Sequence, residues 1–284
     1  MPYLSVVIPV YNSATTINHV VNDCFAALSH LDFELILVND GSTDKSEEVI
    51  FTLAKKHANI KAISLTKNFG EFNAVMCGLN FATGEYTAII DDDGQNPPTE
   101  ILKLLAKAEE GYGVVYARYD EKMHSNWRNA GSGFTNAIAT IITGKRYNLY
   151  LSSFKVIKKN LVQQMVQYTN ANVFPDLLVL KHTKKISEVD VLHKSAAVKS
   201  RYTLSRLIAV FSAMLITGAG FWGYVLYYLL IAVLLVWIYI PIILFTGGKG
   251  GGSGIYMVCI AALVLAILPK TKRDNQYQIK KSSF

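Results

Sequence analysis

The sequence predicts an α/β domain with a mostly parallel sheet and helices on both faces, followed by a hairpin of two transmembrane helices. Two observations support this prediction. In the first part of the chain, short β-branched runs alternate with helical patterns, and this alternation is typical of parallel sheets. From Leu207 to Pro269 the only charged side chain is Lys249, and an apolar stretch of that length is typical of membrane segments.

The elements of the α/β part follow one another regularly up to about residue 120. The predicted strands are Leu4–Val10, Phe33–Asn39, Ile60–Leu65, Tyr86–Ile90 and Gly113–Ala117. Helical patterns fill the intervals at 14–29, 43–58, 71–82 and 98–109. Thr43 and Asp44 are candidate caps of the second helix, and Pro97-Pro98 opens the fourth. Beyond residue 120 the pattern predicts a helix at 126–143 and strands at 151–156 and 186–192.

Composition divides the chain into four regions. They are the α/β domain at 1–200, an amphipathic juxtamembrane helix at 201–217, two transmembrane helices with a glycine-rich loop at 218–270, and a basic tail at 271–284. Residues 222–246 are long enough to cross about 30 Å of hydrocarbon as a helix, whereas 255–268 need their flanks to do so. The sequence leaves open whether 202–216 lies in the membrane interface or enters the membrane.

Charge placement predicts the orientation of this hairpin. Basic residues gather on both sides of the apolar region, at 181–206 and 270–281, so the positive-inside rule places both termini in the cytoplasm, with a bacterial inner membrane favoured. The net charge of +7 indicates attraction to anionic membrane lipid and not to nucleic acid, for which no motif occurs. Met1–Tyr3 leads directly into the first strand without a signal peptide, and three scattered cysteines suggest reduced thiols, so a cytosolic catalytic domain is expected.

Four strings of residues place polar or glycine-rich loops directly after predicted strands. They are SVVIPVYN (5–12), LVNDGSTDKS (37–46), KNFGEFNAVMCGL (67–79) and AIIDDDGQNPP (88–98). Open α/β sheets bind ligands at the carboxyl ends of their strands, and carboxylates, small residues and a tyrosine suit a metal ion, a diphosphate and a flat base. The set resembles family 2 of the inverting nucleotide-sugar glycosyltransferases, which have a Rossmann-like GT-A fold. Within that family it looks most like the polyprenyl-phosphate glycosyltransferases, such as the dolichol-phosphate mannose synthase group and the bactoprenol glucosyltransferases.

The Asp91-Asp92-Asp93-Gly94-Gln95 run is the candidate metal site. Hard divalent cations prefer oxygen ligands, and the resemblance implies that Asp91, Asp93 and Gln95 surround Mg²⁺ or Mn²⁺ and the donor diphosphate. It also implies a catalytic role for Asp93. The simpler alternative is a capped turn before the helix that Pro97-Pro98 opens, because Asp and Gly favour turns.

The resemblance assigns donor binding to residues of all four strings. They are Pro9, Tyr11, Asn12, Asp40, Gly41, Asn68, Asp91 and Asp92. Tyr11 is placed to stack on a nucleobase, or is an ordinary aromatic residue at a strand end. Asp40 either contacts the base and ribose or caps the helix that begins near Thr43. The loop at 67–70 either approaches the ligand closely or is a plain strand-to-helix turn.

Basic residues further along the chain are the candidates for holding a phosphate. Arg128 and Ser132 are four residues apart and share a helical face, Arg118 ends the fifth predicted strand, and guanidinium groups suit phosphate geometry. In the polyprenyl-phosphate enzymes similar residues occur, so the resemblance implies that Arg118, Arg128 and Ser132 bind the donor's or the lipid's phosphate, with Arg128 also catalytic. Lys199 and Ser200 join them, from a segment at 193–202 that resembles the family's last segment before the membrane. The alternative is a solvated basic face.

These residues predict an inverting enzyme that transfers one sugar from a nucleoside diphosphate sugar, with UDP-hexose favoured, to polyprenyl phosphate. A phosphate acceptor needs no strong general base, and none stands out in the sequence. Two alternatives remain: transfer to a sugar hydroxyl of a glycan or lipid, and a degenerate nucleotide-binding membrane scaffold. Ser195, Val198 and Asn148 depart from the family pattern and leave the second open, whereas the missing Gln-x-x-Arg-Trp string argues against a processive synthase. A homo-oligomer is left open.

Overall fold

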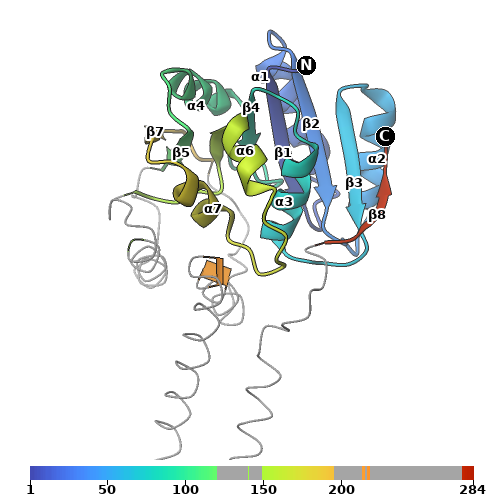
Figure 1. The fold of residues 1–284 in the computed structure, drawn as a ribbon. Helices are drawn as coiled ribbons and strands as arrows, with labels where there is room; N and C mark the ends of the chain where they lie inside the picture. Colours follow the sequence, from blue (N-terminus) through green and yellow to red (C-terminus); the bar gives the residue numbers. More distant parts are fainter. Residues whose placement is uncertain (120–139, 141–148, 195–212, 215, 218–276) are drawn as a thin grey trace, which may run out of the picture.

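The computed structural model describes residues 1–119, 140, 149–194, 213–214, 216–217 and 277–284 (Figure 1). In chain order the elements are β1 (Leu4–Val10), α1 (Ile17–Leu28), β2 (Phe33–Asn39), α2 (Ser46–Lys56), β3 (Ile60–Leu65), α3 (Glu71–Phe81), β4 (Tyr86–Ile89), α4 (Thr99–Glu109), β5 (Val114–Arg118), β6 (Lys155–Lys158), α6 (Lys159–Met165), α7 (Pro175–His182), β7 (Ile186–Asp190) and β8 (Ile279–Ser282).

The strands of the described residues form one mixed sheet of eight strands in the order β7-β5-β6-β4-β1-β2-β3-β8. Strand β1 pairs in parallel with β2 on one side and β4 on the other, and β3 continues in parallel beyond β2. Strands β6 and β8 run antiparallel to their neighbours, and β7 is parallel to β5. The carboxyl ends of β1 to β5 and β7 therefore reach the same edge of the sheet, and β6 begins at that edge.

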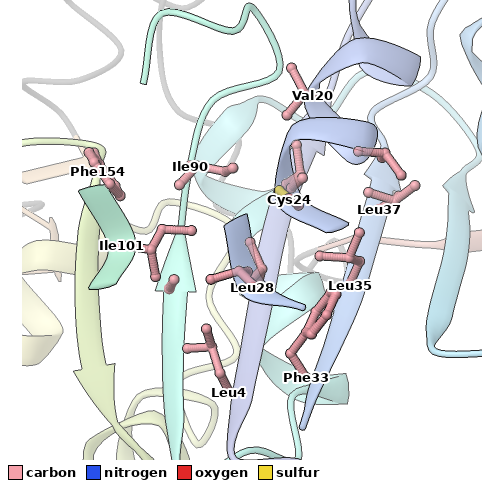
Figure 2. Packing of buried hydrophobic residues seen from close by; sticks show 14 of the residues in the cluster. Leu4, Val20, Cys24, Leu28, Phe33, Leu35, Leu37, Ile90, Ile101 and Phe154 are labelled. Atoms are coloured by element: carbon pink, nitrogen blue, oxygen red, sulfur yellow. The ribbon is translucent and has the colours of Figure 1, made fainter. Parts of the chain in front are cut away.

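Helices cover both faces of the sheet because the central strands are apolar on both sides. Val6 and Ile8 of β1 belong to the core cluster that includes α1, α2 and α4, whereas Val7 belongs to the cluster with α3, α6 and α7. This alternation follows from the two-residue period of a strand. Figure 2 shows the first cluster, where Cys24 and Leu28 of α1 lie against the strands.

The sequence-based boundaries of the first strands are confirmed. Strands β1, β2 and β3 have the predicted limits, β4 ends one residue earlier than predicted, and β5 begins and ends one residue later. The strand predicted at 151–156 was wrong at its start, since β6 begins only at Lys155. Ser152 turns the chain there, because its hydroxyl accepts a hydrogen bond from the backbone N–H of Phe154 at 3.2 Å. The helix predicted at 126–143 lies outside the described residues except for position 140.

The end of the basic tail is an edge strand that the sequence did not predict. Strand β8 pairs antiparallel with β3, and the ring of Phe284 meets that of Phe81 at 5.1 Å between centroids. Figure 1 shows β8 beside β3, at the opposite side of the sheet from β7. In the described residues no helix is both long and apolar enough to span a bilayer. The predicted spans at 222–246 and 255–268 lie outside those residues.

Four described residues of the predicted juxtamembrane helix pack against the α/β domain. Ala213, Met214 and Ile216 are buried, and the first two join the core cluster of α3, α6 and α7. The hydroxyl of Thr217 accepts a hydrogen bond from the backbone N–H of Phe174 at 2.9 Å. The chain just before the predicted transmembrane helices is thus fixed to the face of the sheet that carries α7.

A buried ion pair ties β6 to α7. The ammonium of Lys155 contacts the carboxylate of Asp176, and the side chains are only 5% and 7% exposed. The hydroxyl of Tyr116 on β5 donates a second hydrogen bond to Asp176 at 2.9 Å. Buried charges are tolerated when they are paired and hydrogen-bonded in this way.

We predict that Asp176→Ala destabilises the domain by about 3–5 kcal/mol, because it leaves the Lys155 charge buried without its partner. Chemical denaturation of the full chain measures this. Asp190→Ala is the matched control, since Asp190 pairs with Arg118 at the surface and exposed pairs contribute little. Equal effects of the two substitutions would contradict the importance of the buried pair.

Candidate functional site

The polar loops predicted at strand ends come together at one edge of the sheet. The loops after β1, β2, β3 and β4 supply Tyr11-Asn12, Asp40-Gly41, Asn68 and Asp91–Asp93. The antiparallel strand β6 adds Ser153 from its amino-terminal side. The side chain of Tyr11 is exposed, whereas Pro9 is buried within β1 opposite Val38.

Asp92 joins the loop after β4 to the loop after β1. Its carboxylate accepts a hydrogen bond from the backbone N–H of Tyr11 at 2.9 Å and another from the hydroxyl of Ser13 at 2.5 Å. The Thr16 hydroxyl donates to the Asp92 carbonyl at 2.9 Å. Burial raises the pKa of Asp92, and the bonds from Ser13 and Tyr11 oppose that shift. The carboxylate is therefore committed to holding these loops together.

Asp40 joins the loop after β2 to the loop after β3 in the same manner. Its two carboxylate oxygens accept hydrogen bonds from the backbone N–H groups of Phe69 at 2.7 Å and Gly70 at 2.9 Å. Burial raises its pKa, and these two bonds act against the shift. Asp40 thus orients the start of α3, and the alternative that it caps the helix near Thr43 was wrong. Asp44 is the capping group there, since it accepts from the Ser46 N–H at 2.9 Å.

The loops after β1 and β2 also bind each other directly. The Asn12 N–H donates to the Ser42 hydroxyl at 2.9 Å, and the Thr43 N–H donates to the Asn12 side-chain oxygen at 2.8 Å. Asn12 has a φ of 53°, in the left-handed region that asparagine adopts more readily than most residues. Gly41 has a φ of 62°, and a Cβ there would lie 2.3 Å from the Lys67 carbonyl carbon. Only glycine permits the loop after β2 to approach the loop after β3 this closely.

The other two carboxylates of the acidic run face a different environment. Asp91 accepts hydrogen bonds from the hydroxyl of Ser153 at 2.8 Å and the side-chain amide of Asn96 at 3.0 Å. Burial raises the pKa of Asp91 to about 7, and the negative charge of Glu71 adds to the rise. Asp93 is exposed and accepts a local hydrogen bond from the Gln95 N–H at 3.0 Å. A cation beside Asp91 and Asp93 would favour their ionised forms.

Carboxylate and amide oxygens fit a hard divalent cation, and these two carboxylates leave room for ligands from a substrate. Among the described residues, no group of three or more His, Cys, Asp and Glu side chains is arranged to hold a metal by itself. A cation at Asp91 and Asp93 would need further oxygen ligands, which Gln95, water or the diphosphate of a donor could supply. The capped-turn alternative accounts for the Asp93 bond, but not for the bond that Asp91 accepts from Ser153, which lies outside the turn.

A polar network behind Asp91 was missed by the sequence reasoning. The Tyr119 hydroxyl donates to the side-chain oxygen of Asn96 at 2.9 Å, and His193 Nδ1 lies 3.3 Å from the same oxygen. The rings of Tyr119 and His193 lie 4.5 Å apart, and the Ser152 hydroxyl donates to Tyr119 at 3.1 Å. The segment beginning at His193 therefore reaches the acidic run. The one sequence signal was the match of His193 to the family's premembrane segment.

The predicted phosphate-binding residues are only partly described. Arg118 lies at the end of β5, where its guanidinium forms a two-bond ion pair with Asp190 at 2.6 and 2.8 Å. Both side chains are exposed, so an anion can compete for the guanidinium. Arg128, Ser132, Lys199 and Ser200 lie outside the described residues.

Comparison with known proteins agrees with this geometry. The family model described as Glycosyl transferase family 2 matches residues 5–167, which is more than half of the chain. The chain belongs to glycosyl transferase family 2. The four strand-end loops described above all lie within the part that matches this family.

Curated relatives of this family 2 chain share one description. A protein of Photorhabdus laumondii is 35% identical over 209 residues, and one of Proteus mirabilis is 34% identical over the same length. Both are described as undecaprenyl-phosphate 4-deoxy-4-formamido-L-arabinose transferase. The matches cover 72% of this chain and 64% of each relative, so the chain covers just under two thirds of their length.

Solved structures share the fold of the family 2 chain. Glucosyl-3-phosphoglycerate synthase from Mycobacterium tuberculosis, in complex with Mn²⁺ and UDP, has a TM-score of 0.58 at 18% identity, over 76% of this chain and 80% of that one. Mannosyl-3-phosphoglycerate synthase from Rubrobacter xylanophilus has a TM-score of 0.59 at 18% identity, with 75% and 72% covered. At these identities the likeness concerns the fold, and it agrees with the predicted GT-A class.

We predict that Gly41→Ala destabilises the family 2 chain by about 1–3 kcal/mol and weakens nucleotide binding, because it combines positive φ with a steric conflict. Thermal unfolding and UDP titration measure the two effects. Gly111→Ala is the control, since Gly111 also has positive φ but a Cβ there meets nothing within 4 Å. Unchanged UDP affinity in Gly41→Ala would contradict a donor role for this loop.

Proposed function

We propose that this family 2 chain transfers one sugar from a nucleoside diphosphate sugar to polyprenyl phosphate, with inversion at the anomeric carbon. The observation that carries the proposal is the joining of four strand-end loops at one edge of the sheet. The loop after β4 also presents the carboxylates of Asp91 and Asp93 there. Ligands bind at this edge in open α/β sheets. The descriptions of the curated relatives support polyprenyl phosphate as the acceptor.

On the donor side, the loops divide the work. Tyr11 is exposed at the end of β1 and is proposed to stack on the base, while the Asp40-Gly41 turn and Asn68 lie along the nucleoside. We propose that Asp91, Asp93 and Gln95 hold Mg²⁺ or Mn²⁺, which offsets the negative charge of the leaving diphosphate. Asp92 contributes by holding Tyr11 in place.

UDP is the favoured nucleotide, and the M. tuberculosis structure with UDP is consistent with that choice. For the sugar, a hexose and the modified pentose named in the curated relatives' descriptions are both to be tested. Transfer from a panel of nucleotide sugars to undecaprenyl phosphate, followed by mass spectrometry of the lipid product, decides between them. If no sugar is transferred from any of these donors although nucleotide still binds, a non-catalytic scaffold is favoured.

On the acceptor side, the chemistry needs positioning more than a base. A phosphate monoester has a second pKa of about 6 and is mostly dianionic near neutral pH. One of its oxygens attacks the anomeric carbon, the bond to the donor diphosphate breaks, and the diphosphate leaves with the electron pair. We propose that Arg118, Arg128 and Ser132, with Lys199 and Ser200, hold the reacting phosphates. The Arg118 pair with Asp190 is then exchanged for a pair with phosphate.

The acceptor would reach this site from a membrane beside it. We propose that the apolar region crosses the membrane twice, with the α/β domain and both termini in the cytoplasm. Two contacts support an even number of crossings: Thr217 is fixed beside α7 before the predicted transmembrane helices, and β8 joins the sheet after them. Chain segments on both sides of the predicted transmembrane helices thus belong to one folded domain.

Reporter fusions test this topology. We predict that a reporter at Phe284 and one in the 247–254 loop report opposite sides of the membrane, because each span reverses the side. The fusion at Phe284 is preceded by a flexible linker so that β8 still pairs with β3. Reporters on the same side would reduce the apolar region to a single span or none.

Substitution of Arg128 tests the acceptor. Charge-assisted contacts to phosphate contribute about 1.5–3 kcal/mol, so Arg128→Ala is predicted to lower transfer roughly ten- to a hundredfold. If Arg128 holds the lipid phosphate, the acceptor KM rises or kcat falls while UDP affinity is unchanged. If it holds the donor diphosphate, UDP binding weakens. Equal turnover with an unphosphorylated polyprenol or a sugar acceptor would reject the polyprenyl-phosphate assignment and favour the hydroxyl alternative.

A further inference from the structure

A continuous chain of hydrogen bonds runs from the C-terminal strand to the proposed donor loops. It begins at Lys280 on β8, whose ammonium donates to both carboxylate oxygens of Glu47 on α2, at 3.1 and 3.0 Å. The hydroxyl of Ser64 on β3 donates to the same carboxylate at 2.8 Å. Lys280 follows the predicted membrane hairpin in the sequence, so this contact links the end of the protein to its first half.

The chain of hydrogen bonds continues through fully buried side chains to the loop after β2. The side-chain amide of Asn39, at the end of β2, donates to the Ser64 hydroxyl at 2.9 Å, and both side chains are 0% exposed. The Asn39 side-chain oxygen accepts from the Ser42 N–H at 3.2 Å. The Ser42 hydroxyl in turn accepts from the Asn12 N–H at 2.9 Å. The last members are therefore the two loops that carry the proposed nucleoside contacts.

Each bond in this chain fixes the direction of the next one. A serine hydroxyl has a single proton, and Ser64 directs that proton to Glu47, which leaves its lone pairs to accept from Asn39. The amide nitrogen of Asn39 must then face Ser64, and its oxygen must face the N–H of Ser42. Without an ordered Glu47 carboxylate, the Ser64 proton is free to turn towards Asn39. The reversed amide would then place its NH₂ group against the Ser42 N–H, where no hydrogen bond forms.

The backbone of β8 places Lys280 for this contact. Ser64 pairs with Lys281 and Leu65 pairs with Ile279, so Lys280 is the extra residue of a register shift. Bulges of this kind re-aim a side chain. The neighbouring Lys281 reaches the same helix, but its ammonium lies 4.3 Å from the centre of the Phe51 ring. The two adjacent lysines therefore share charge, strand and partner helix, but Lys280 donates hydrogen bonds to Glu47 whereas Lys281 lies over the Phe51 ring.

We propose that Lys280 is a positioning residue of the donor site, which acts through Glu47, Ser64 and Asn39 on the Ser42 turn. The inference rests on the proposed function, because the loops that it orients are those assigned to the nucleotide. If so, β8 influences the affinity for the donor nucleotide, although Lys280 lies on the outermost strand of the sheet.

The test uses the full chain in detergent and compares Lys280→Gln with Lys281→Gln. Titration with UDP and Mn²⁺ should show affinity about three- to tenfold weaker for Lys280→Gln, the range expected for loss of one link in a hydrogen-bonded network. The donor KM should rise by a similar factor with kcat little changed. Lys280→Arg should restore affinity, and Lys281→Gln should bind UDP as the wild type does.

Two further measurements separate positioning from a general loss of structure. In a double-mutant cycle, Lys280→Gln should add no further loss of UDP affinity to Glu47→Gln, because both break the same link. Hydrogen exchange without nucleotide should be faster at residues 40–44 in Lys280→Gln but not in Lys281→Gln. UDP affinity and exchange equal to those of Lys281→Gln would overturn the proposal, as would a lowered kcat and melting temperature at unchanged KM. If the wild type binds no nucleotide, the proposed function fails. The exchange measurement alone then decides whether the chain of hydrogen bonds from Lys280 orients the Ser42 turn.

Discussion

The site depends on two carboxylates, those of Asp40 and Asp92, which accept hydrogen bonds from neighbouring loops. Asp40 is buried and Asp92 is partly buried. Asp40 holds the loop after β3 from the end of β2, and Asp92 holds the loop after β1 from the end of β4. A parallel sheet brings strand ends to one edge, but it does not fix the loops that follow them. These carboxylates do so by accepting hydrogen bonds from backbone N–H groups of the loops. Tyr11, Gly41 and Asn68 are positioned as a result.

Much of this arrangement follows from the sequence, because it depends on local patterns. The strands β1, β2 and β3 were predicted with their observed limits since each is a short apolar run ended by polar or glycine-rich residues. The gathering of four loops at one edge followed from the parallel sheet alone. The membership in glycosyl transferase family 2 was anticipated by the order of the four strings and is confirmed by the family match.

Other parts depend on which strands are neighbours, and the sequence carries little signal for that. The bond from the Tyr11 N–H to Asp92 exists because β1 and β4 are adjacent. The sequence alone therefore did not show whether Asp92 contacts the donor nucleotide or a neighbouring loop. Strand β8 consists of Ile279-Lys280-Lys281-Ser282, all exposed, and has no alternating apolar face to reveal it. Its partner is an edge of the sheet that is more than two hundred residues earlier in the chain.

The C-terminal strand also relates the predicted membrane region to the site. Thr217 on one side of that region and β8 on the other both bind the α/β domain, so the domain is held at two places to the segment proposed to meet the acceptor's lipid. Lys280 then connects the second attachment to the donor loops. The proposed donor site and the proposed membrane attachment thus belong to one folded domain, with Asp91 and Asp93 at its carboxyl edge.

Metal binding in the presence and absence of nucleotide tests whether the carboxyl edge of the sheet is a metal-dependent donor site. Mn²⁺ bound to the full chain is measured by electron paramagnetic resonance, with and without UDP. We predict weak binding to the protein alone and tight binding with UDP, because a hard cation needs about six oxygen ligands and Asp91 and Asp93 supply only part of them. Asp93→Ala should abolish the tight binding. UDP that binds equally well in EDTA, or Mn²⁺ that binds equally tightly to Asp93→Ala, would contradict the assignment of this edge as a metal-dependent donor site.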